Sequence, residues 1–298
     1  MPTILLAGGT GLIGRRLSEM LRAEGHTVRI LTRKPQHPEQ FSWNPASGSM
    51  DASALQGVDY VVNLAGAGIA DKRWTAHRKK EIIESREQSA HTLRVAFLQS
   101  GIKPKAYLSA SAIGYYGNSG EQWMTETSAP VDTSFMVECC RRWEAAADEV
   151  AALGIRTVKL RIGVVLAKEG GALAEFVKPL RFGVGGYFAD GQAWYSWVHL
   201  DDVCRMFIWA TENQQMEGVF NAVAPNPVRN RDLVKAIAQA MHQPALIVPG
   251  PAFAMKFLLG EMAAVILNSN KVSAEKIQQA GFKFQHPEIR EALEQIFA

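Results

Sequence analysis

The stretch Ile4-Leu5-Leu6-Ala7-Gly8-Gly9-Thr10-Gly11-Leu12-Ile13-Gly14 joins an apolar run to a helical pattern over residues 15–24. Its glycines fit G-x-G-x-x-G when counted from Gly9 and G-x-x-G-x-x-G when counted from Gly8. Glycine permits a tight turn with positive φ and lets a pyrophosphate approach the backbone amides at a helix N-terminus. Both spacings therefore predict a strand, a turn and a helix that bind a dinucleotide.

Apolar runs and helical patterns alternate along the chain after this unit. We expect strands over residues 26–32, 59–64, 105–109 and 157–162, and helices over residues 74–100 and 135–153. Strands that alternate with helices indicate βαβ units. The chain is therefore predicted to be an α/β protein with a doubly wound parallel sheet, the Rossmann arrangement.

The pattern changes near residue 166, where glycine-rich loops begin, and order resumes at residues 197–199 and in a helix over 202–211. Ligands of open α/β sheets bind beyond the carboxyl ends of the strands, where long loops gather. We predict an NAD(P)-binding domain over residues 1–165, to which residues 197–224 return, and a smaller substrate lobe over residues 166–298. The apolar stretch 252–267 is interrupted by Lys256 and Glu261 and predicts a buried amphipathic helix.

Composition argues against several classes of partner. The formal net charge of the 298 residues is only +3, which argues against nucleic acid or a membrane surface as a partner. Three cysteines, Cys139, Cys140 and Cys204, are too few for a disulfide framework and lack zinc-ligand spacing. We expect no metal, a cytoplasmic protein, and a small molecule as its partner; the oligomeric state stays open, with a homodimer among the options.

The end of the second strand bears on the choice of cofactor. It reads Leu31-Thr32-Arg33-Lys34, without the carboxylate that hydrogen-bonds the ribose 2′-hydroxyl of NAD. Arg33 can pair with a 2′-phosphate, whereas a carboxylate would repel it. This favours NADP over NAD, the alternative being that Arg33 and Lys34 are simply a solvated pair.

Four segments of this sequence resemble the extended short-chain dehydrogenase/reductase superfamily of nucleotide-sugar epimerases and dehydratases. They are residues 8–14; Asn63-Leu64-Ala65-Gly66; Leu108-Ser109-Ala110-Ser111-Ala112 with Tyr116-Gly117; and Trp197-Val198-His199-Leu200-Asp201-Asp202-Val203. The likeness covers nearly the whole chain. Three further segments narrow the resemblance to the atypical "epimerase family protein" group: Lys72-Arg73-Trp74-Thr75, Ser85-Arg86 and the loop 185–197.

The resemblance implies roles for particular residues. The residues it places on the cofactor are Gly8, Gly11, Leu12 and Ile13 at the pyrophosphate, Thr32 and Arg33 at the adenosine, and Leu64, Ala65, Gly66 and Arg161 along the rest of the dinucleotide. It makes Ser111 the active-site serine. From the residues alone, Ser111 equally fits a hydrogen bond to a carbonyl group or to ordered water.

The usual catalytic pair of that superfamily is missing from this chain. Its hydride-transfer enzymes use Tyr-x-x-x-Lys on the helix after the serine strand, and the lysine lowers the pKa of the tyrosine. Here those two places hold Phe135 and Cys139, or Met136 and Cys140 if Glu144 sets the register. The usual proton shuttle cannot operate with these residues.

Two tyrosines just beyond Ser111 offer an alternative to the missing pair. Tyr115 is a candidate proton donor acting with Ser111, although it lacks a neighbouring cation in the sequence. The alternative is that Tyr115 and Tyr116 form an aromatic pocket wall. We expect Tyr116 to border the substrate in either case.

Basic residues surround Trp74 after the third strand. These basic residues are Lys72, Arg73, Arg78 and Lys79. They predict a site for an anionic substrate, with Trp74 stacked on a ring of that substrate. The alternative is a solvated helix face. Near residue 200, we expect one of Asp201 and Asp202 to cap a helix and His199 to be a core or loop residue rather than a metal ligand.

Two functions follow from these observations. The first is an NADP-dependent epimerase or oxidoreductase with a non-standard active site, acting on a carbonyl-bearing or nucleotide-sugar-like substrate. The second is an NADP(H)-binding sensor or scaffold without turnover. The glycine- and aromatic-rich loops of the second lobe favour the first, and the missing tyrosine and lysine favour the second.

Overall fold

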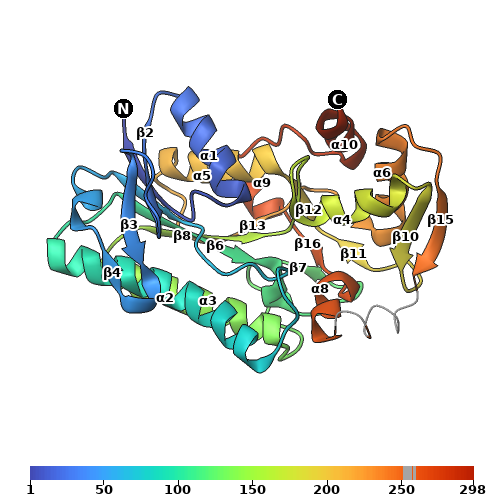
Figure 1. Ribbon diagram of the computed structural model, residues 1–298, viewed down its shortest axis with the longest axis horizontal. Helices are drawn as coiled ribbons and strands as arrows, with labels where there is room; N and C mark the ends of the chain where they lie inside the picture. The colour runs from blue at the N-terminus through green and yellow to red at the C-terminus, as the bar shows by residue number, and fades with distance from the viewer. Residues whose placement is uncertain (251–256, 258–259) are drawn as a thin grey trace.

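An eight-stranded sheet forms the centre of the computed structural model, which describes residues 1–250, 257 and 260–298 (Figure 1). Its strands follow the order β13-β8-β6-β5-β1-β2-β3-β4. Neighbours are parallel throughout, except that β3 and β4 form an antiparallel pair. The bounds are β1 Thr3–Ala7, β2 Thr27–Thr32, β3 Gln40–Asn44, β4 Ser49–Met50, β5 Tyr60–Asn63, β6 Ala106–Ala112, β8 Thr157–Ile162 and β13 Gly218–Ala222.

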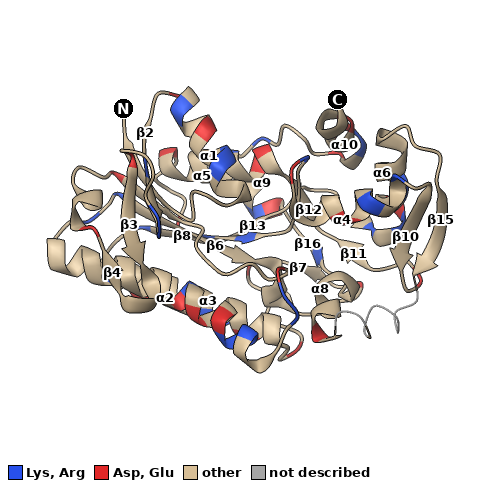
Figure 2. Ribbon diagram, in the orientation of Figure 1, with Lys and Arg blue, Asp and Glu red and all other residues tan. Residues whose placement is uncertain are grey.

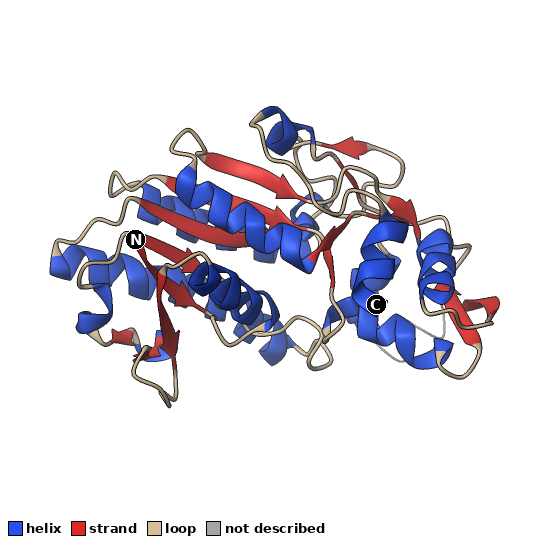
Figure 3. Cartoon of the chain, turned by 90° about the horizontal axis from the view of Figure 1, so that it is seen from above, coloured by secondary structure: helices blue, strands red, loops and turns tan. Residues whose placement is uncertain are grey.

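Helices cover both faces of this sheet. Helices α1 (Leu12–Ala23) and α5 (Leu200–Glu212) lie on one face, and α2 (Ala76–Ser100) and α3 (Phe135–Ala151) on the other (Figures 1 and 3). Alternate residues of β1 serve the two layers: Leu6 belongs to the core with Leu17 of α1, and Leu5 to the core with Leu93 of α2. The α/β prediction with a doubly wound parallel sheet is confirmed.

A smaller lobe with its own core lies beyond the carboxyl ends of the strands (Figure 1). It contains α4 (Gly171–Leu180), α6 (Asn230–Ala240) and α10 (Ile289–Phe297), with the paired strands β10 (Val184–Phe188) and β15 (Leu246–Gly250). Strand β11 (Trp194–Tyr195) pairs with β14 (Val228–Arg229). Residues 200–222 supply α5 and β13 to the central sheet and its cover.

Short elements connect the two regions. Strand β9 (Val164–Leu166) pairs with β12 (Trp197–His199), and β7 (Trp123–Met124) pairs with β16 (Lys271–Val272). Residues 252–256 and 258–259 of the helix expected over residues 252–267 lie outside the described residues. The described residues 260–267 form a 3-10 turn at Gly260–Ala263 and α8 at Ala264–Leu267. Helix α9 spans Glu275–Gln279, and the other 3-10 turns are Pro45–Ser47, Ala52–Leu55 and Ile113–Tyr116.

Acidic and basic residues are interspersed over the helices (Figure 2). Among the described helices, none is both long and apolar enough to cross a bilayer.

Candidate cofactor and substrate site

The turn between β1 and α1 has the geometry that its glycines predict. Gly8 has a φ of +80°, and a Cβ there would lie 2.8 Å from the carbonyl carbon of Leu64. A Cβ on Gly14 would lie 2.3 Å from the Gly8 oxygen. A Cβ at Gly9, which has ordinary φ, would meet side chains only, Ile30 at 3.0 Å and Leu6 at 3.4 Å, so the close approaches to backbone favour the spacing counted from Gly8.

Helix α1 begins without a side-chain cap. Gly11 is its N-cap, and no described side chain accepts a hydrogen bond from the first turn, which contains Leu12 and Ile13. The first N–H groups of a helix lack partners inside it and favour an anion. The turn therefore fits a pyrophosphate, and Gly11 leaves room for it because the nearest atom to an added Cβ is 3.4 Å away.

Arg33 follows β2 beside this turn. Leu31 is in register with Ala7, so the residues after β2 lie next to the residues after β1. Thr32 is half-buried, and Arg33 is exposed and has no ion-pair partner within the described residues. No Asp or Glu occurs over residues 32–38, so Arg33 stands where an NAD-binding carboxylate would otherwise be.

The segment after β5 lies on the other side of the glycine turn. Leu64 donates its backbone N–H to Ala7 O (2.8 Å), and Ala65 donates to Asn63 Oδ1 (3.1 Å). Gly66 is exposed on one side and touches the Arg86 guanidinium on the other. The structure thus brings Gly8, Leu64, Ala65 and Gly66 together at one edge of the sheet.

Ser111 points away from this edge, toward α3. Its hydroxyl donates to Glu144 Oε1 (2.7 Å), and the side chain is only 2% exposed. Glu144 forms a two-point ion pair with Arg161, from Nε to Oε1 (2.7 Å) and from Nη2 to Oε2 (2.8 Å). The hydroxyl hydrogen of Ser111 is therefore already engaged inside the fold.

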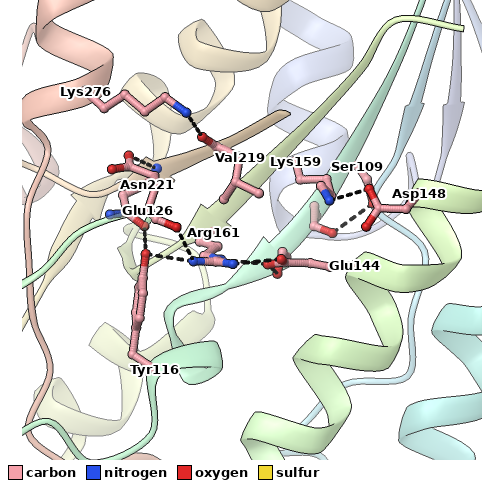
Figure 4. A network of polar contacts seen from close by, with 12 residues as sticks. Ser109, Tyr116, Glu126, Glu144, Asp148, Lys159, Arg161, Val219, Asn221 and Lys276 are labelled. Atoms are coloured by element: carbon pink, nitrogen blue, oxygen red, sulfur yellow. Dashed lines mark hydrogen bonds and ion pairs between the residues drawn. The ribbon is translucent and has the colours of Figure 1, made fainter. Parts of the chain in front are cut away.

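Arg161 joins this pair to Tyr116 (Figure 4). Arg161 Nη1 donates to Tyr116 Oη (3.0 Å), and Tyr116 donates to Asn221 Oδ1 (2.6 Å). Burial raises the pKa of Tyr116 to about 12. Glu126 completes the group by accepting from the Asn221 backbone N–H (2.8 Å).

Three of the expected site residues lie inside the fold. Arg161 is 3% exposed and Tyr116 is fully buried, and their polar atoms are engaged with each other and with Glu144 and Asn221. Ser111 is buried with them, since odd-numbered residues of β6 face α3. Tyr115 differs: it is half-buried, and the Arg161 guanidinium lies 3.4 Å from its ring centre.

Helix α3 carries both candidate pairs of residues. A Cβ on Gly114, just after β6, would lie 3.1 Å from Met136 Cε and 3.6 Å from Cys140 Sγ. Phe135 and Cys139 pack with Trp74, and Met136 also contacts that cluster. Met136 and Cys140 therefore face the loop after β6, in the register that Glu144 indicates. Burial raises the pKa of the Cys140 thiol, so it offers neither a cation nor a base.

Trp74 and Arg78 were expected to contact the substrate, but both side chains are buried. Trp74 is 8% exposed, donates Nε1–H to Ile69 O (2.9 Å), and packs edge-to-face on Phe135 at 4.7 Å. Arg78 is buried and ion-paired with Glu81, which also excludes a solvated face at this position. Arg73 is exposed.

The expectation that Asp201 or Asp202 caps the helix near residue 200 is wrong. His199 caps α5, because its Nδ1 accepts from the Asp201 N–H (3.1 Å). Asp201 instead pairs with Arg16 of α1, and Asp202 accepts from the backbone of Gln285 (2.9 Å). The described residues contain no group of three or more His, Cys, Asp or Glu side chains suited to a metal.

Sequence reasoning missed the structural part played by Glu144, Asn221 and Glu126. The available signal was a carboxylate on the buried face of an amphipathic helix, since Glu144 is flanked by Cys140 and Ala147 on that face. A buried carboxylate requires a partner. The strand pattern over residues 157–162 offered two charged candidates for that partner, Lys159 and Arg161.

The glycine turn, the uncapped helix and the parallel sheet define a Rossmann nucleotide-binding protein. The chain belongs to the NAD dependent epimerase/dehydratase family, whose model matches residues 4–222. A domain of unknown function, DUF1731, matches residues 251–296.

Relatives match the chain along its full length. It is 38% identical to the chloroplastic epimerase family protein SDR39U1 homolog of Arabidopsis thaliana, over 99% of this chain and 86% of that protein. It is 36% identical to the epimerase family protein YfhF of Bacillus subtilis, over 99% and 98% of the two chains.

Solved structures give the same picture. The human epimerase family protein SDR39U1 (isoform 2), crystallised with NADPH, superposes with a TM-score of 0.89 at 32% identity over 99% of both chains. The nucleoside-diphosphate sugar epimerase of Corynebacterium glutamicum gives 0.81 at 31% identity, over 100% of this chain and 58% of that one.

Proposed function

We propose that this protein binds NADP(H) between the glycine turn and the segment after β5. The observation that carries this proposal is the cradle at Gly8 and Gly14, which an added Cβ would fill, together with the uncapped start of α1. Leu12 and Ile13 would donate backbone N–H groups to the pyrophosphate. Arg33 and Thr32 would hold the 2′-phosphate and ribose, and Leu64, Ala65 and Gly66 would lie along the dinucleotide.

The reaction that fits is reduction or epimerisation of a small carbonyl-bearing or nucleotide-sugar-like substrate. Membership of the epimerase/dehydratase family supports it. When bound, NADP(H) supplies hydride transfer. Tyr115 is the proton donor in this proposal, because it is half-buried in the loop after β6 and Arg161 fixes its ring; Ser111 positions that loop through Glu144.

The two regions would divide the work. Residues 1–165 with 197–224 would hold the cofactor, and the rest of 166–298 would cover the substrate. The three cysteines are buried and unlinked, which supports a reducing compartment such as the cytoplasm.

One observation favours the second candidate, an NADP(H)-binding sensor or scaffold. Met136 and Cys140 face the loop after β6, and neither can assist proton transfer. The two candidates differ in whether a substrate is turned over.

The test has two arms, because reduction consumes NADPH whereas epimerisation returns the cofactor to its starting state. The protein loaded with NADPH is followed at 340 nm with a panel of aldehydes and ketones, and the protein loaded with NADP⁺ is incubated with UDP-sugars whose anomeric proton NMR signals are followed. The enzyme proposal predicts turnover of at least one compound, which Tyr115→Phe slows at least tenfold. No turnover in either arm, with hydrogen exchange that differs between the NADPH and NADP⁺ forms, would instead support the sensor.

A further inference from the structure

The loop over residues 66–70, which we call the β5 loop, is held by side chains from below. Three successive carbonyl groups accept from three different residues: Ala67 O from Arg86 Nη1 (3.1 Å), Gly68 O from Arg78 Nη2, and Ile69 O from Trp74 Nε1 (2.9 Å). All three donors come from α2 or the segment just before it. The loop backbone is therefore fixed in one orientation.

This orientation determines where the loop N–H groups point. In a trans peptide the C=O of one residue and the N–H of the next point in opposite directions, and no described peptide is cis. The N–H groups of Gly68 and Ile69 therefore face away from the arginine that holds the preceding carbonyl, and the N–H of Ala70 faces away from Trp74. None of the three donates to an acceptor among the residues that the structure describes.

The β5 loop lies at the surface. Gly66 and Ala70 are exposed, and Gly68 and Ile69 are half-buried. The Asp71 carboxylate lies against Gly68, since an added Cβ there would be 2.3 Å from both of its oxygens, so the Ile69 and Ala70 end of the loop is the better place for an anion. Successive backbone N–H groups that converge on one side of a loop form an anion-binding concavity. The β5 loop also follows Gly66, so it continues directly from the segment proposed to lie along the cofactor.

Arg86 is a buried cation beneath the loop, where its Nη1 donates to Ala67 O (3.1 Å) and Ile82 O (2.8 Å). It is 6% exposed, its guanidinium lies 4.7 Å from the Trp143 ring centre, and its buried Nε has no partner in the described part of the chain. No carboxylate pairs with it there, unlike Arg78, which has Glu81 and Asp71. Burial lowers the pKa of Arg86, which reflects the cost of an uncompensated cation.

We propose that the β5 loop binds a phosphate or carboxylate group of the substrate through the N–H groups of Ile69 and Ala70, with Arg86 supplying the compensating charge beneath. The inference rests on the proposed function, since it assigns the substrate an anionic group. Arg86 acts through the loop and is a positioning residue.

The sequence permits a direct spectroscopic test. Labelling with [¹³C′]glycine and [¹⁵N]isoleucine selects Gly-Ile pairs, and the chain has three of them: Gly68-Ile69, Gly101-Ile102 and Gly154-Ile155. The amides of Ile102 and Ile155 serve as internal controls. The protein is saturated with NADPH and titrated with inorganic pyrophosphate, and separately with malonate, to distinguish phosphate from carboxylate.

We expect a saturable downfield shift of the Ile69 amide proton with at least one anion. Arg86→Met should weaken this binding about tenfold, Arg86→Lys should restore most of it, and Arg142→Met, at an exposed arginine of α3 paired with Glu87, should leave it unchanged. NADPH fluorescence confirms that each variant is folded and loaded.

Three results would overturn the proposal. The Ile69 amide does not move more than the two control amides; or Arg86→Met binds the anion as tightly as the wild type; or NADPH alone shifts Ile69 and the anion adds nothing, which would assign the loop to the cofactor. Failure of the proposed function is separate, because it appears as absent NADPH binding before any anion is added.

Discussion

Arg33, just after β2, is the residue on which we propose that the choice of cofactor depends. Its guanidinium is exposed beside the glycine turn, with no carboxylate over residues 32–38. Arg33→Glu should weaken NADPH binding about 10–100-fold, because it replaces a charge-assisted hydrogen bond by repulsion. Fluorescence titration should show little change for NADH. The control Arg181→Glu changes net charge equally at an exposed arginine of the other lobe; an equal loss in that variant would assign the effect to net charge.

The buried pair of Glu144 and Arg161 is predicted to support the fold. Glu144→Gln leaves Arg161 buried without its counter-charge and turns one of the two accepting oxygens into an NH₂ donor, so the free energy of unfolding should fall by about 3 kcal/mol in urea titrations. Glu87→Gln breaks an ion pair that is largely exposed and should cost less than about 1 kcal/mol. Similar losses in the two variants would contradict the structural role.

At this scale, sequence predicted residue types better than side-chain directions. The glycines and Arg33 could be placed because their roles depend on backbone geometry and position after a strand. Ser111, Tyr116 and Trp74 were assigned to an open site, but their partners lie far along the chain, as with Asn221 and Tyr116, 105 residues apart. The spacing of residues within one segment of sequence cannot predict hydrogen-bond partners that come from a distant segment.

At the scale of elements, the β1–turn–α1 unit allows binding and folding to be separated. Gly14→Ala places a Cβ 2.3 Å from the Gly8 oxygen, so it should destabilise the protein by more than about 2 kcal/mol. Gly11→Ala meets no atom closer than 3.4 Å and should change stability by less than about 1 kcal/mol while weakening NADPH at least tenfold. Thermal unfolding and NADPH titration of both variants check this. If Gly11→Ala kept full NADPH affinity, the pyrophosphate would not lie at this turn.

Element boundaries followed from local signals where such signals existed. The pattern over residues 74–100 predicted a helix, and α2 begins at Ala76 because Thr75 caps it. Strand β4 and the strand pairs of the smaller lobe were not foreseen. Several of these strands have only two residues, too few to show a period of two.

At the scale of the whole molecule, His199 links the cofactor region to the C-terminal helix. It caps α5 through Nδ1, and its Nε2 lies 3.0 Å from Gln295 Oε1 of α10. Burial and the neighbouring His286 lower the pKa of His199 below 6.5, while Asp201 and Asp202 oppose this shift. As pH falls, His199 is therefore protonated in the unfolded chain before it is protonated in the folded protein. The contribution of neutral His199 to the free energy of unfolding is complete above about pH 6.5 and decreases as pH falls toward the folded-state pKa.

This linkage predicts a pH-dependent loss of stability. His199→Asn keeps a capping oxygen and should flatten the decrease between pH 7.5 and 5.5, which one proton limits to about 1.4 kcal/mol per pH unit. Urea titrations across this range measure it, with His91→Asn, at an exposed position of α2, as control. An unchanged slope in His199→Asn would assign the pH dependence to other groups.

The central claim is that the cradle between β1, α1 and β5 holds NADP(H) and that Arg33 selects it over NAD(H). Parallel fluorescence titrations of the wild-type protein with NADPH and NADH test this directly. The account predicts saturable binding of NADPH at least tenfold tighter than that of NADH. Equal affinities would contradict the role of Arg33, and no binding of either dinucleotide would contradict the cofactor site itself.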